Sequence, residues 1–113
     1  MTVKEVADII GASILTKQAD TEKQVKEGYT GDLLRWVMAH GREGMAWTTV
    51  QTHMNVIAVA SLHDMSCVII PEGIRMEDDV VEKADEEGIC VLSSSLTAFD
   101  ICGRLAAAGI GAC

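Results

Sequence analysis

The stretch from residue 45 to residue 62 constrains the fold more than any other part of this 113-residue chain. Residues 46–50 (AWTTV) are rich in β-branched and aromatic side chains, which predicts a short strand. Residues 56–62 (VIAVASL) are almost wholly apolar and predict a helix that is covered on most sides. The polar bend QTHMN separates them. A strand, a polar bend and a buried helix in this order are typical of a ligand-binding corner in an α/β protein.

Strand-like and helix-like segments alternate along the rest of the chain. Strands are predicted at residues 13–16, 25–30, 46–50, 67–70 and 89–92, and helices at residues 3–10, 32–40, 56–62, 76–87 and 98–108. Unbroken apolar runs such as CVII at residues 67–70 are typical of parallel strands buried on both faces. We therefore expect an α/β fold, a three-layer sandwich with a small, mostly parallel sheet of about five strands and helices on both faces.

Length, charge and cysteine spacing exclude several classes of protein. A chain of 113 residues suits one domain, so we expect residues 1–113 to form a single unit. The net charge of −8 disfavours binding to nucleic acid or to a membrane surface. We expect no signal peptide, because residues 1–10 (MTVKEVADII) lack a basic region followed by a long apolar block, and no apolar run of about 18 residues could span a membrane. The four cysteines (Cys67, Cys90, Cys102 and Cys113) lack C-x-x-C spacing, which favours free thiols in the cytoplasm.

Three polar loops should meet at one edge of the sheet if the strands are parallel, because ligands of open α/β sheets bind outside the carboxyl ends of the strands. Two of these loops lead into helix N-termini, where free amides and the helix dipole favour an anion such as phosphate or carboxylate. The candidate ligand-binding residues are Gly31, Asp32, Thr49, Gln51, Thr52, His53, Asn55, Ser93, Ser94, Ser95 and Thr97.

Each candidate also has a structural interpretation. Asp32, Asn55 and Ser95 are suited to cap the helices that follow them. His53 can contact a phosphate, act as a base or hydrogen-bond a neighbouring loop. The chain lacks the G-x-S-x-G, H-x-x-x-H and glycine-rich phosphate-loop motifs. We therefore predict no catalytic residue, no metal site and no cofactor.

The chain resembles the DRTGG domain family in its small stand-alone form. The resemblance covers essentially the whole chain and rests on Asp20, on residues 25–34 (VKEGYTGDLL) and on residues 47–60 (WTTVQTHMNVIAVA). Within the motif that names the family, Asp20 stands for the acid, the arginine is absent and Gly28 is what remains of the glycine pair. The resemblance implies an α/β domain similar in fold to the N-terminal domain of HPr kinase/phosphorylase. Such domains occur alone or attached to CBS domains and phosphotransacetylase-type enzymes. These associations imply a regulatory role.

Together these observations predict a non-enzymatic regulatory or sensor domain. Its ligand would be a small anion, either a nucleotide or a phosphorylated or carboxylate metabolite, bound at the carboxyl ends of the strands. A homodimer is expected, because a small chain with 49% hydrophobic residues has much apolar surface to cover. Two alternatives stay open: an interaction module that docks a partner enzyme, and a small enzyme that uses His53 with the serine-rich loop.

Overall fold

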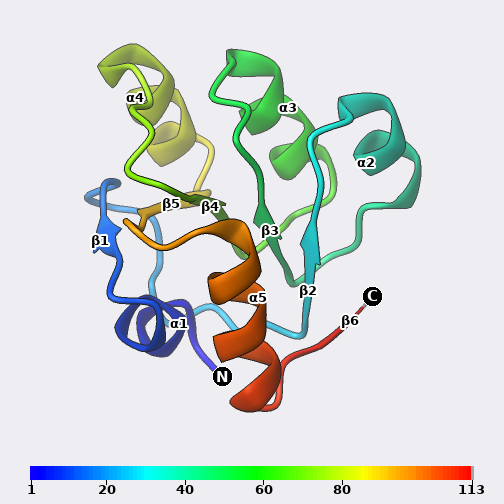
Figure 1. Ribbon diagram of the computed structural model, residues 1–113. Coiled ribbons are helices and arrows are strands. Elements are labelled where there is room, and N and C mark those ends of the chain that lie inside the picture. Colours follow the sequence, from blue (N-terminus) through cyan, green and yellow to red (C-terminus); the bar gives the residue numbers. More distant parts are fainter. Residues whose placement is uncertain (113) are drawn as a thin grey trace.

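The computed structural model describes residues 1–112, which form a six-stranded sheet and five helices (Figure 1). The sheet has the order β1-β5-β4-β3-β2-β6. Strands β2 to β5 are parallel to their neighbours, β6 is parallel to β2, and β1 is antiparallel to β5. The strands are β1 (Ser13–Ile14), β2 (Glu27–Thr30), β3 (Met45–Thr48), β4 (Cys67–Ile70), β5 (Cys90–Ser93) and β6 (Gly111–Ala112). The helices are α1 (Val3–Ile9), α2 (Leu34–His40), α3 (Met54–Leu62), α4 (Asp78–Glu86) and α5 (Ala98–Ala107).

The helices cover both faces of the sheet. Each step from β2 to β5 moves one strand along the sheet, and the three helices of these steps, α2, α3 and α4, pack on one face. Helices α1 and α5 pack on the other face (Figure 1). The predicted three-layer α/β sandwich with a mostly parallel sheet is confirmed. Among residues 1–112, no helix is both long and apolar enough to cross a membrane.

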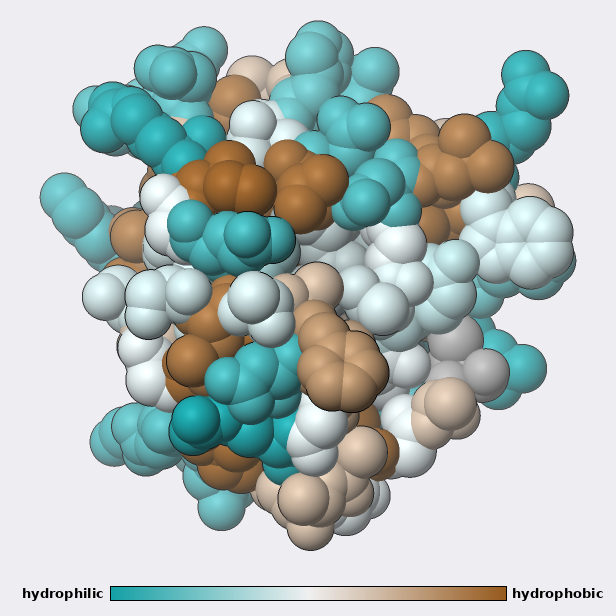
Figure 2. Space-filling view, viewed as in Figure 1, coloured by the Kyte–Doolittle hydropathy of each residue, from teal (hydrophilic) through white to brown (hydrophobic). Residues whose placement is uncertain are grey.

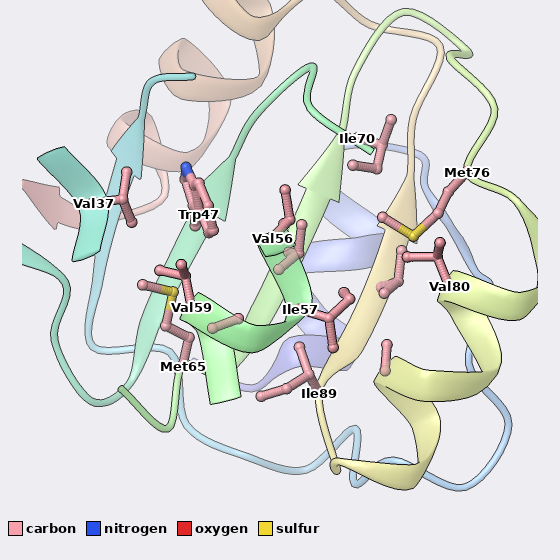
Figure 3. Close-up of a cluster of buried hydrophobic side chains, with 14 of the residues drawn as sticks. Val37, Trp47, Val56, Ile57, Val59, Met65, Ile70, Met76, Val80 and Ile89 are labelled. Carbon is pink, nitrogen blue, oxygen red and sulfur yellow. The ribbon is translucent and has the colours of Figure 1, made fainter. Parts of the chain in front are cut away.

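The larger core lies between the sheet and the helices α2, α3 and α4. Trp47 of β3 is fully buried there and lies close to Val56 and Val59 of α3 (Figure 3). The ring nitrogen Nε1 of Trp47 donates a hydrogen bond to the carbonyl oxygen of Gly31 at 2.8 Å, so the indole's polar atom is satisfied. This bond joins the core to the first loop at the carboxyl edge of the sheet.

The second core lies between the sheet and the helices α1 and α5. Cys67 and Cys90 are register partners on β4 and β5, and both are buried free thiols within this core. Burial raises the pKa of the Cys67 thiol, and the neighbouring Cys90 raises it further. Both cysteines therefore behave as small apolar side chains.

The two edges of the sheet differ from the prediction. The first predicted strand, residues 13–16, is reduced to Ser13–Ile14 and runs antiparallel to β5. Thr16 leaves the ladder, and its Oγ1 accepts a hydrogen bond from Val91 N at 3.3 Å. Strand β6 was not predicted, because a glycine–alanine pair has no β propensity and forms a strand here through its pairing with β2.

A single carboxylate organises the irregular segment after β1. Asp85 of α4 accepts hydrogen bonds from Gln18 N and Ala19 N at 2.8 Å through Oδ1, and from Lys17 N at 3.0 Å through Oδ2. These backbone amides have no partner in a helix or sheet ladder, so the carboxylate satisfies them. The same hydrogen bonds, that from Gln18 above all, lower the pKa of Asp85.

We expect Asp85→Asn to lower the thermal midpoint at pH 7. The carboxylate contributes stability above its unfolded-state pKa of about 3.9, and this contribution is lost as the pH falls through the lower folded-state pKa. The difference in midpoint between wild type and variant should therefore shrink below about pH 4, as followed by circular dichroism. The control is Glu82→Gln on the same helix, which should change little. A difference that does not vary with pH would contradict this account.

We expect Ile70→Ala to reduce the free energy of unfolding by roughly 2–5 kcal/mol in urea titrations, because Ile70 is fully buried in the larger core. The matched control is Leu62→Ala on α3, where the side chain is 67% exposed and the change should stay within about 0.5 kcal/mol. Equal losses in the two variants would show that burial at β4 does not dominate stability.

Candidate functional site

The parallel register places the predicted loops at one edge of the sheet. Strands β2, β3 and β5 end at Thr30, Thr48 and Ser93, and β4 between them ends at Ile70. The loops that follow therefore leave the sheet on the same side, as the sequence predicts. Ligand binding by these loops stays a prediction.

Asp32 ties the loop after β2 to the loop after β3. Its Oδ1 accepts hydrogen bonds from Thr49 Oγ1 at 2.8 Å and from Val50 N at 2.9 Å. Gln51 Nε2 in turn donates to the carbonyl oxygen of Asp32 at 3.4 Å. The prediction that Asp32 caps the following helix is wrong: the N-cap of α2 is Leu33, which makes no side-chain cap bond. The Asp32 carboxylate accepts hydrogen bonds from the loop after β3 instead of from the first turn of α2.

His53 begins α3 in place of the predicted cap Asn55. The His53 Nδ1 accepts a hydrogen bond from Asn55 N at 3.1 Å. An Nδ1 that accepts carries no proton, so the proton of the neutral ring is on Nε2, which can donate. Gln51, His53 and Asn55 are exposed and Thr52 is half-buried. Side-chain donors therefore surround the N-terminus of α3.

The serine-rich loop is held by internal hydrogen bonds. Ser94 is buried, and its Oγ donates to the carbonyl oxygen of Ile10 at 2.8 Å and accepts from Leu96 N at 3.2 Å. The cap of α5 is Thr97, whose Oγ1 accepts from Asp100 N at 3.2 Å, and not Ser95 as predicted. Ser93 pairs with Ser13 across the β1–β5 ladder. This leaves Ser95 as the exposed serine of the three.

The candidate residues fall into two groups, because β4 lies between β3 and β5. Two strand spacings separate the ends of β3 and β5 by about 10 Å. The loop after β4 fills the interval next to the serines: Glu72 N donates to Leu96 O at 2.8 Å and Gly73 N to Ser94 O at 2.9 Å. One group therefore contains Gly31, Asp32, Thr49, Gln51, Thr52, His53 and Asn55, and the other contains Ser93, Ser94, Ser95 and Thr97.

Two arginines near this edge were not predicted. Arg35 lies in the first turn of α2 and is exposed. Arg75, in the loop after β4, approaches Glu77 at 4.0 Å and Asp78 at 3.6 Å. The signal that could have found them is their position shortly after a predicted strand. Among residues 1–112, no group of three His, Cys, Asp or Glu side chains is placed to hold a metal ion.

A groove of about 320 Å³ on the α5 face was also missed. Its floor is made by small or short side chains of β2 and β3, namely Gly28, Thr30, Ala46 and Thr48. Its walls come from α5 and the end of the chain, with Cys102, Leu105, Ala106, Ile110, Gly111 and Ala112. The alternation of small residues on two neighbouring strands is the sequence signal for a sheet face that a helix does not fill.

No family model and no curated protein sequence matches this chain. A solved structure does: the CBS and DRTGG domains of the regulatory region of Clostridium perfringens pyrophosphatase, complexed with the activator diadenosine tetraphosphate. The two structures align with a TM-score of 0.72 at 12% sequence identity. The alignment covers 92% of this chain and 45% of the other, so the chain spans less than half of that region. This agreement confirms the fold implied by the sequence resemblance: the protein has a DRTGG-like α/β fold.

Proposed function

We propose that this chain is a regulatory domain that binds a small phosphorylated ligand, with a nucleotide as the first candidate, at the carboxyl edge of the sheet. The observation that carries the proposal is the set of side-chain donors around the N-terminus of α3. The similarity to a regulatory region whose structure contains a nucleotide activator supports the same class of function. We further propose that residues 1–113 act as one domain.

The chemistry of the α3 N-terminus suits the oxygens of a phosphate. The backbone amides of the first turn carry partial positive charge. The Nε2–H of His53, the amide groups of Gln51 and Asn55 and the hydroxyl of Thr52 add neutral donors around them. Because the chain carries a net charge of −8, these short-range hydrogen bonds must supply the attraction for an anion.

Asp32 has a positioning role in this proposal. A carboxylate would repel an anionic ligand, but its Oδ1 holds Thr49 and Val50, the residues immediately before Gln51. The bend that carries the donors is thereby fixed to the loop after β2. The serine group lies on the far side of β4 and contacts the ligand only if the ligand extends about 10 Å along the edge.

The setting of the domain is also part of the proposal. Cys67, Cys90 and Cys102 are free thiols, which supports the cytoplasm as its compartment. The predicted homodimer and partner enzyme remain proposals.

Docking of a partner enzyme is a second candidate function, favoured by the exposed apolar side chains of Leu33 and Trp36 at α2, which are 67% and 49% exposed. The enzymatic alternative has less support, because His53 Nδ1 and Ser94 Oγ are both occupied by structural hydrogen bonds.

We expect ATP or diadenosine tetraphosphate to raise the thermal midpoint of the wild-type chain. Free ligand at 100 times its dissociation constant adds about 2.7 kcal/mol to the free energy of unfolding. Gln51→Glu should abolish the shift, because it replaces a donor with a like charge beside the phosphate. His53→Asp should do the same while keeping an acceptor for Asn55 N. Inorganic phosphate, measured in parallel, shows whether the nucleoside contributes.

The matched control is Gln24→Glu, which changes net charge equally at an exposed position before β2, where the side chain accepts from the N-terminal ammonium. This variant should keep the full ligand shift. No shift in the wild type at millimolar nucleotide, or equal shifts in Gln51→Glu and Gln24→Glu, would refute the proposed site.

A further inference from the structure

Helix α5 presents an apolar strip to solvent. Phe99 is 90% exposed, the highest value among the exposed large hydrophobic side chains. Cys102, Gly103 and Ala106 follow at spacings of three, four and seven residues and so lie on the same side of the helix. Figure 2 views the molecule from the α5 side: tan and white residues occupy the lower middle of this face, and a hydrophilic group lies beside them. An exposed apolar strip of this kind marks a contact surface.

The groove of about 320 Å³ adjoins this strip, since Cys102 and Ala106 line it together with Leu105 and Ile110. Phe99 lies seven residues from Ala106, or about 10 Å along the helix axis. One helix therefore carries both a protruding aromatic ring and an apolar hollow. This pairing is self-complementary under two-fold symmetry, where the same patch serves both copies.

We propose that a second copy of this chain docks on α5, with the two α5 helices antiparallel about a two-fold axis near residues 102–103. This arrangement puts Phe99 of each copy beside Ala106 of the other, at the groove. Gly103 lies at the centre of the strip, and a Cβ added there would meet nothing within 4 Å. The absence of a side chain at this point lets the two helix backbones approach closely.

The charges on α5 fit the same arrangement. Asp100 and Arg104 pair within one helix at 3.2 Å and border the apolar strip. Because they are four residues apart, antiparallel helices centred near residue 102 bring Asp100 of one copy beside Arg104 of the other. These two residues cancel, so α5 is neutral in a chain of net charge −8. By contrast α4 carries Asp78, Asp79, Glu82, Asp85 and Glu86 against Lys83. Two like-charged copies therefore meet with less repulsion through α5 than through α4.

This inference assigns a surface and a geometry to the proposed homodimer and does not depend on the proposed ligand site. Helix α3, which carries the proposed anion site, packs on the opposite face of the sheet from α5. The dimer can therefore form without ligand, and failure of one proposal leaves the other standing.

Light scattering coupled to size exclusion tests the dimer. The wild-type chain should have the mass of two copies, and Phe99→Asp should halve it while leaving the circular dichroism spectrum unchanged, because the side chain is exposed. Leu62→Asp is the matched control, since Leu62 is 67% exposed on α3 at the other face, and it should keep the dimer mass. A monomeric wild type, a dimeric Phe99→Asp or a monomeric Leu62→Asp would overturn the proposal.

Cross-linking tests the antiparallel geometry. In a background of Cys102→Ser and Cys113→Ser, Gly103→Cys should give a covalent dimer when diamide oxidises the two thiols to a disulfide. Ala58→Cys, at an exposed position of α3, should stay monomeric on a non-reducing gel. A dimer of some other geometry would leave Gly103→Cys uncross-linked and would overturn the two-fold arrangement near residues 102–103.

Discussion

Burial of β4 on both faces is the constraint on which the rest of this structure depends. Cys67, Val68, Ile69 and Ile70 are all fully buried, with alternate side chains entering the two cores. A strand with apolar side chains on both faces requires a helix layer on each side. The parallel neighbours β3 and β5 then follow, because each is joined to β4 through one helix. The shared carboxyl edge, where the candidate site lies, is a consequence of this packing.

Polar side chains in this fold hold together loops that have no ladder of their own. Asp32 joins the loops after β2 and β3, Ser94 joins the serine-rich loop to α1, and Asp85 holds the segment after β1. Each of these side chains accepts or donates to groups far away in sequence. Irregular backbone needs such partners because its amides and carbonyls are otherwise unsatisfied. Several residues that the sequence presents as candidate ligand contacts therefore hold loops together.

The two faces of the sheet divide the proposed roles. The α2–α3–α4 face ends in the donors at the start of α3, where a phosphate is proposed to bind. The α5 face is left partly open by the small residues of β2 and β3, and the groove beside Phe99 is proposed to receive a second copy. Under these two proposals, ligand binding and self-association would use different faces of the same sheet. Trp47 belongs to the first of these faces: it is buried in the larger core and bonded to Gly31.

The sequence by itself determined the alternation of strands and helices, the parallel sheet and the edge where polar loops meet. These features rest on hydrophobic period and on unbroken apolar runs such as Cys67–Ile70, which are local properties of the chain. The caps at His53 and Thr97 were missed, because several neighbouring side chains can cap equally well and loop geometry chooses among them. Helix α2 begins after Leu33 without a side-chain cap, because the Asp32 carboxylate binds the loop after β3 instead. Strand β6, the division of the site by β4 and the groove beneath α5 were decided by tertiary structure. Each depends on which segments become neighbours. Local hydrophobic periodicity does not show which distant segments pair with one another.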